Sequence, residues 1–198
     1  IIKNIYNIMK KEELFKIQCN TLNVNIGDVL ISEPFMNDYY FRRSVILMID
    51  HNEEGSLGIV INKRVSIPFN EIVEGFPEFK ADVYLGGPVE TDRIFFIHTV
   101  GEMIPDSHRI SSGLYWSGNV SALKSMIKMD LIKAHELRFF VGYAGWGDGQ
   151  LIKELQANTW IVGRFTTKEL LQTKPGKMWS SFVNQMGIYF SLFSVFVP

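Results

Sequence analysis

The chain has 198 residues, 46% of them hydrophobic, so it is long enough to form one packed domain without disulfides or metals. Its 20 basic and 21 acidic residues nearly balance, which argues against a nucleic-acid-binding domain. Cys19 is the single cysteine, which excludes an intrachain disulfide and favours a reducing, cytoplasmic location. The first residues lack the apolar segment and cleavage site of a secretory signal, and no apolar run is long enough to span a membrane.

The first predicted elements form an antiparallel hairpin preceded by a short strand. Asp28–Ser32 reads as that short strand, and Ser44–His51 is a nearly continuous apolar run, typical of a strand covered on both faces. Asn52–Ser56 is a polar turn that contains a glycine, and Leu57–Asn62 returns as the partner strand.

The rest of the chain mixes helices and strands without strict βαβ alternation. The predicted elements, in chain order, are a short helix at Phe69–Gly75, strands at Val83–Leu85 and Arg93–Thr99 around a Gly86–Gly87–Pro88 turn, an amphipathic helix at Val120–Met129, a strand at Arg138–Tyr143, a Gly-rich turn at Ala144–Gly149, a helix at Gly149–Ala157, a strand at Thr159–Phe165, a short helix opened by a capping box of Thr166 and Glu169, a helix at Lys177–Met186 and a last strand at Gly187–Pro198 packed on the core. This order predicts an α/β (α+β) protein with a mixed or largely antiparallel sheet, and not a doubly wound one.

Catalytic and metal-binding signatures are absent from the sequence. The four histidines at 51, 98, 108 and 135 are far apart and fit no metal-ligand spacing. There is no Gly-x-Ser-x-Gly motif, and Cys19 lies in a polar N-terminal segment, so no nucleophile is visible. We therefore predict no metal, no cofactor and no catalytic residue, and we favour a protein that is not an enzyme.

The Gly-rich stretch 142–155 (GYAGWGDGQLIKEL) is the most informative local feature. A strand that feeds a Gly-rich turn and a helix can present backbone N–H groups to an anion. The glycine spacing, however, matches neither G-x-G-x-x-G nor a Walker A motif. With Gly147 as the helix N-cap, Asp148 supplies negative charge to the first turn and Gln150 can cap its start, so a phosphate is disfavoured and a tight structural turn is favoured.

Three stretches together resemble the AlgH/YqgE family of bacterial proteins. They are GDVLISEPFMNDYYFRRSVILMIDHNEEGSLGIVINK from residue 27, GGPV at 86–89 and GYAGWGDGQLIKELQANTW at 142–160. Ser32–Glu33 departs from an alanine-containing pair that is common in the family, and Asp148 stands where proline is usual. The resemblance implies a single domain at 26–198 after a partly ordered N-terminal extension at 1–25, with a branched sheet curled into a partial barrel and helices packed outside. It also implies the family's label of transcriptional regulator, which names no biochemical activity.

Two functional readings stay open, and a third is disfavoured. The first is a non-enzymatic interaction or regulatory module, and the second is a small-molecule-binding protein or enzyme with a pocket beside the Gly-rich turns. Specific DNA binding is disfavoured because no basic recognition helix is visible. The partner is an unidentified protein or small molecule, no membrane contact is expected, and the chain is a monomer or a homodimer.

The candidate binding surface joins polar side chains to the two glycine-rich turns. Its members are Arg43, His51, Asn62, Gly86, Gly87, Pro88, Trp146 and Gln150. We expect the two turns to lie close together at one end of the sheet. Trp146 either stands at the edge of a shallow concave surface there or folds inward and plugs the end of the sheet.

Overall fold

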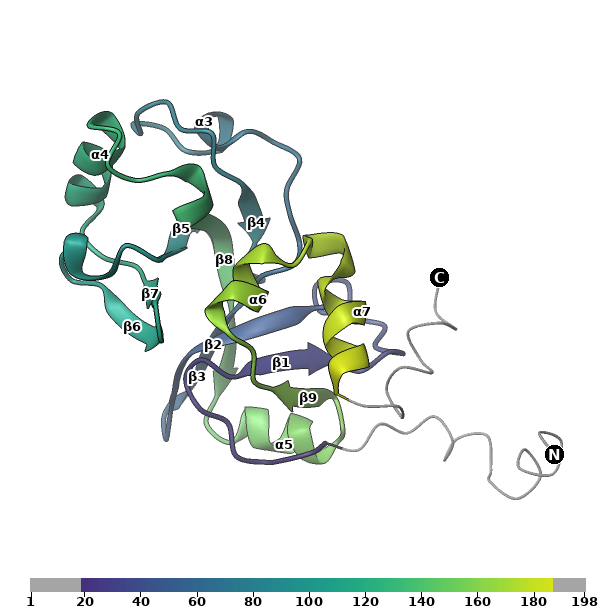
Figure 1. Cartoon of the computed structure of the whole chain (residues 1–198). Helices are drawn as coiled ribbons and strands as arrows, with labels where there is room; N and C mark the ends of the chain where they lie inside the picture. The colour runs from purple at the N-terminus through teal and green to yellow at the C-terminus, as the bar shows by residue number, and fades with distance from the viewer. Residues whose placement is uncertain (1–18, 187–198) are drawn as a thin grey trace, which may run out of the picture.

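The computed structural model describes residues 19–186 and has a mixed α+β architecture built on one large, mainly antiparallel sheet (Figure 1). The nine strands are β1 (Val29–Ser32), β2 (Val45–Asn52), β3 (Gly55–Val60), β4 (Val83–Leu85), β5 (Val89–His98), β6 (His108–Ser111), β7 (Leu114–Trp116), β8 (Leu137–Gly147) and β9 (Trp160–Gly163). The helices are α3 (Phe69–Ile72), α4 (Val120–Lys128), α5 (Gln150–Gln156), α6 (Thr167–Gln172) and α7 (Pro175–Gln185), with 3-10 turns at Gly101–Met103 and Ala134–Glu136. Within the described range, no helix is long and apolar enough to cross a membrane.

The long strand β8 joins two parts of the sheet, which has the order β6-β7-β5-β8-β3-β2-β1-β9. One edge of β8 pairs with β5, and its C-terminal end at Ala144–Gly147 pairs with β3. Strand β4 pairs in parallel with β8 over Phe139–Val141 and fills the space where β3 diverges from β8. The sheet is therefore branched at β8, as the family resemblance implies.

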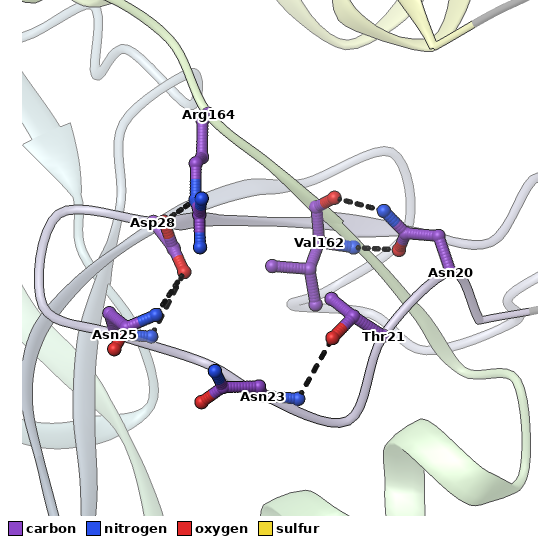
Figure 2. Close-up of polar contacts among 7 residues, drawn as sticks. All are labelled: Asn20, Thr21, Asn23, Asn25, Asp28, Val162 and Arg164. Atoms are coloured by element: carbon purple, nitrogen blue, oxygen red, sulfur yellow. Dashed lines mark hydrogen bonds and ion pairs between the residues drawn. The ribbon is translucent and has the colours of Figure 1, made fainter.

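The expected partial barrel is wrong, because the sheet is open and not strongly curled. Strands β6 and β9 lie at the two ends of the strand order, and no ladder within residues 19–186 joins them. The outer edge of β9 is covered instead by the Asn20 side chain, which donates to the Val162 carbonyl at 2.7 Å and accepts from the Val162 N–H at 3.0 Å (Figure 2). A side-chain amide thus takes the place that a neighbouring strand would occupy.

The segment before β1 is fixed to the sheet by further polar contacts. Asp28 accepts a hydrogen bond from the Asn25 backbone N–H at 2.9 Å and forms an ion pair with Arg164 at 3.0 Å (Figure 2). Val24 is buried in the core on the same side as α5. Because Arg164 is well exposed, its ion pair contributes little to stability, and the buried Val24 anchors the segment more strongly.

Helices cover both faces of the β9-β1-β2-β3 part of the sheet. Helices α6 and α7 pack on one face through Leu170, Met178, Trp179, Phe182 and Val183, whereas α5 packs on the other through Leu151 and Leu155 (Figure 1). Helices α3 and α4 cover β4, β5 and the first half of β8. The nearly continuous apolar run in β2 is thereby explained, since both of its faces are buried.

Most local predictions agree with the structure within one to four residues at each boundary. The hairpin, the helices near residues 120 and 150 and the Thr166–Glu169 capping box are confirmed. The Gly-rich turn predicted at Ala144–Gly149 is wrong, because β8 runs on to Gly147 and Asp148–Gly149 alone connects it to α5. Strands β6 and β7 were not predicted, and Gly187–Pro198 lies outside the described residues.

His98 is a buried polar residue that ties the β6–β7 region to β5. The side chain is 1% exposed, and its Nε2 donates to the Ser117 carbonyl at 3.1 Å, which leaves Nδ1 as an acceptor. Nδ1 is buried and has no hydrogen-bond partner within the described structure. Burial lowers the pKa of His98, against a smaller opposing effect of the hydrogen bond to Ser117. The folded protein therefore holds this histidine in its neutral form.

We expect the free energy of unfolding to fall as pH drops below about 6.5, the ordinary His pKa. The pKa of His98 is lower in the folded chain, so the unfolded chain binds the extra proton first and stability is fully present above that pH. Urea unfolding at several pH values should show this loss in the wild type and a smaller one in His98→Leu. Equal pH profiles for the two proteins would contradict the assignment.

Gly87→Ala should destabilise the fold by at least about 2 kcal/mol, because overpacking against a rigid backbone cannot relax. A Cβ at Gly87 would lie 2.2 Å from the backbone carbonyl of Tyr143 on β8. Gly176→Ala in α7 is the matched control, since its Cβ meets nothing within 4 Å, and it should stabilise by about 0.5–1 kcal/mol. Chemical denaturation measures both changes, and equal stability of the two variants would refute the close-contact argument.

Candidate functional site

A groove of about 380 Å³ opens between the tip of the β2–β3 hairpin and the start of α5. Its volume is within the range of about 300–1,000 Å³ that is usual for small-ligand sites. The lining residues are His51, Asn52, Glu53, Gly55, Ser56, Gly147, Asp148, Gly149, Leu151 and Ile152. Polar groups thus come from the hairpin and from the β8–α5 connection, and the apolar surface comes from α5.

The hairpin wall is set by the strand register. His51 lies directly opposite Ser56, so both side chains point to the same face, and His51 Nδ1 is 2.7 Å from Ser56 Oγ. On its other side Ser56 lies opposite Trp146 of β8. Both His51 and Ser56 are half-buried, so this hydrogen-bonded pair is accessible from the groove.

The helix wall begins at a tight connection. Gly149 is the N-cap of α5 and has φ of 62°, a conformation that glycine adopts without strain. The Gln150 side chain accepts from the Gly147 N–H at 3.1 Å. The predicted helix cap is wrong, because the N-cap is Gly149, which has no side-chain cap hydrogen bond, and Asp148 precedes the first turn. Gln150 also donates to Glu154 at 2.9 Å and so connects the turn to the helix.

Glu154 holds this wall against the sheet. Its Oε2 accepts hydrogen bonds from the indole N–H of Trp146 at 2.9 Å and from that of Trp160 at 2.7 Å. The two indole rings pack edge to face, with centroids 6.1 Å apart. Hydrogen bonds to a carboxylate are among the stronger ones in proteins, so α5 is fixed to both β8 and β9.

Trp146 therefore folds inward. It is 6% exposed and belongs to the core under α5, so the alternative in which it edges a concave surface is wrong. Trp146 lies within β8, and the alternation of side chains along the strand directs it to the face that α5 covers. In a turn, the same residue would have been free to face solvent. Trp146 supports the groove from beneath and is not one of its lining residues.

The remaining predicted residues divide between two other places. Arg43 and Asn62 lie at the opposite end of β2 from His51, where Asn62 donates to the Arg43 carbonyl and accepts from the Val45 N–H, both at 2.9 Å. The Arg43 guanidinium lies 5.9 Å from the centroid of the Trp179 ring. The structure thus gives Asn62 a backbone-bridging role and does not bring this pair to the groove.

Gly86, Gly87 and Pro88 lie beside the middle of β8. The Gly86 carbonyl accepts from Val60 N–H, and Gly87 is in close contact with the backbone of Tyr143 and Ala144. Gly86 and Gly87 meet Gly142, Tyr143 and Ala144, so the two segments are in contact only at the first residue of Ala144–Gln150, and the contact lies along β8 and not at one end of the sheet. Their contact is between backbones within the sheet, so it does not by itself form a surface.

A lysine near Arg43 was not identified from the sequence. Lys63 donates to the Tyr40 carbonyl at 2.6 Å, and its pKa is lowered by burial and then by the nearby Arg42. The hydrogen bond to the Tyr40 carbonyl fixes the loop 38–44 to Lys63, beside Arg42, so this lysine has a structural role. It does not contact the groove.

Several groove residues were missed because they fall in the turn that was treated as polar connection. Ser56, Glu53 and Asn52 belong to this group. Leu151 and Ile152 also line the groove but lie on α5. A signal was present: a two-residue turn at Glu53–Glu54 places Ser56 opposite His51. In the described part of the chain, no group of three or more His, Cys, Asp or Glu residues could hold a metal ion.

Comparison with known proteins identifies relatives over nearly the whole chain. A family model described as "DUF179: AlgH-like" matches residues 29–191. A UPF0301 protein of Parabacteroides distasonis is 40% identical over 178 residues, which is 89% of this chain and 90% of that protein. A UPF0301 protein of Bacteroides thetaiotaomicron is also 40% identical, over 93% of this chain and 94% of its own length.

Two solved structures share the fold. The solution structure of the AlgH protein from Pseudomonas aeruginosa superposes with a TM-score of 0.70 at 27% identity, over 92% of this chain and 99% of that one. A crystal structure of a Corynebacterium diphtheriae protein has a TM-score of 0.73 at 23% identity, over 95% and 100% of the two chains. With a family match and curated relatives that both cover most of its length, the chain belongs to the AlgH-like family.

Proposed function

We propose that this protein is a non-enzymatic binding module and that the groove between the β2–β3 hairpin and α5 is its ligand site. The observation that carries the proposal is the groove itself: a cavity of about 380 Å³ that joins an accessible His51–Ser56 pair to the apolar Leu151 and Ile152. Small-ligand sites combine a mainly apolar concave surface with a few fixed polar groups, and this groove has that composition.

Binding fits the geometry better than catalysis does. A Ser–His contact alone resembles part of a hydrolytic site, but such sites also orient the imidazole with a carboxylate. Within residues 19–186, the one side-chain hydrogen bond of His51 is to Ser56. The pair therefore supplies a hydrogen-bonding surface, and no base with a fixed orientation follows from it.

The rigid walls also favour a binding role. One wall is a paired hairpin, and the other is a helix fixed by Glu154 to two tryptophans. Because little has to be reordered when a ligand enters, less interaction energy is lost on binding. A regulatory function would then consist of ligand binding that changes how this surface meets a partner.

A fragment screen of the full chain by ¹H–¹⁵N NMR tests the proposal. Fragments that bind should shift amide signals of His51–Ser56 and Gly147–Ile152 together, and a fragment at 100 times its Kd should stabilise the fold by about 2.7 kcal/mol. Ile152→Trp adds bulk inside the groove and should abolish these shifts.

Ile72→Trp is the matched control, because Ile72 is also half-buried on a helix but lies outside the groove. It should bind fragments as the wild type does, provided that thermal melting shows both variants folded. Shifts that map elsewhere, or that persist unchanged in Ile152→Trp, would overturn the proposal.

A further inference from the structure

We infer that the groove binds an alkylammonium group, the charged end of a lysine side chain or of a free aliphatic amine. This inference rests on the binding function proposed above and adds the chemical class of the ligand. It depends on the charge of the groove, on the partners of its polar groups and on the apolar surface between them.

The groove is acidic although the whole chain is nearly neutral. Glu53 lines it from the hairpin and Asp148 lines it from the β8–α5 connection, and no lysine or arginine is among the lining residues. Asp50 and Glu54 are exposed on the same hairpin. Since the formal net charge of the chain is −1, this concentration of carboxylates is local and attracts cations to this end of the sheet.

The two lining carboxylates are available to a ligand. Neither Glu53 nor Asp148 has a hydrogen-bonded or ion-pair partner for its side chain in the described part of the chain. By contrast, Asp28 and Asp82 are each paired with an arginine, and Glu154 is occupied by two indoles. A cation that enters the groove therefore displaces no protein contact of these two groups.

The neutral polar groups suit a donor with several hydrogens. The Ser56 hydroxyl has lone pairs beyond its contact with His51, and an ammonium group carries three donors and no acceptor. Leu151 and Ile152 supply an apolar surface next to these acceptors. An alkyl chain can lie on that surface while its charged end remains among oxygen atoms, as lysine side chains do on proteins.

An anionic ligand fits poorly. A phosphate or carboxylate would approach two unpaired carboxylates without a lysine or arginine in the lining to offset them. Asp148 lies one residue before Gly149, the N-cap of the seven-residue helix α5, so the protein itself places a carboxylate next to the start of this helix. The charge of the groove thus selects against phosphorylated ligands.

Titration of the full chain with two probes, followed by NMR, tests the inference. Cadaverine represents free amines, and Nα-acetyl-lysine amide represents a lysine side chain of a partner. Nε-acetyl-lysine amide with a blocked α-amine is the uncharged comparison. At least one charged probe should saturate with shifts at His51–Ser56 and Gly147–Ile152, and the uncharged probe should bind about fivefold or more weakly, as expected for loss of a partly exposed ion pair.

Charge variants show whether the two carboxylates are responsible. Glu53→Gln and Asp148→Asn should each weaken the charged probe by about twofold to fivefold, and 0.5 M salt should weaken it further. Glu102→Gln and Asp92→Asn are matched controls, since both residues are exposed acids outside the groove, and they should leave the affinity unchanged.

The outcomes separate this inference from the proposed function. If neutral or anionic fragments shift the groove signals and both amines do not, the groove is a site but the inference of a cationic ligand is wrong. If the amines bind equally in Glu53→Gln, Asp148→Asn and the two controls, the inference is again wrong. Preference for cadaverine identifies a free amine as the ligand class, and preference for the lysine probe identifies a protein side chain.

Discussion

The backbone of β8 passes so close to the β4–β5 connection that no side chain fits between them. A Cβ on Gly86 would lie 2.2 Å from the Gly142 carbonyl oxygen, and one on Gly142 would lie 2.6 Å from the Gly87 carbonyl oxygen. This approach lets Gly86 accept from Val60 N–H and donate to the Val141 carbonyl, each at 2.8 Å. A single residue thereby joins β3 to β8 where the two strands diverge. Without it, the backbone groups at the branch would be buried without hydrogen bonds, which is costly.

The position of the groove follows from this branch. Because β8 stays in strand conformation beyond the branch, its last residues pair with β3 and bring Trp146 opposite Ser56. Ser56 in turn fixes His51 across the hairpin. Trp146 then offers its indole N–H to Glu154, so the same strand that aligns the hairpin wall also anchors the helix wall. A change at the glycine contacts should therefore reach the groove through a rigid strand and not through a flexible loop.

Local sequence signals located most of the secondary structure but not the arrangement of its candidate site residues. The β2–β3 hairpin and the Thr166–Glu169 capping box depend on neighbouring residues, so their patterns were sufficient. The sequence predicts Gly145 and Gly147 in a turn, yet they lie in the same strand as Gly142, whose backbone is closely approached by the backbone of Gly87. Arg43 precedes β2 and His51 lies near its C-terminal end, so the two predicted members of one site are at opposite ends of this strand. Such distinctions depend on which strands pair over long distances, and local patterns carry no information on that.

The charge of the groove has the same long-range origin. Glu53 and Asp148 are far apart in the sequence, and each is an ordinary acidic residue in its own polar turn. The pairing of Gly55 with Gly147 brings their two turns together, so the ends of two adjacent strands contribute like charges to one cavity. Neither carboxylate has an ion-pair partner in the described part of the chain, so both line the groove without a counter-charge from the protein. A cationic ligand would supply that counter-charge. The strand pairing that builds the cavity therefore also sets the charge of the ligand that it favours.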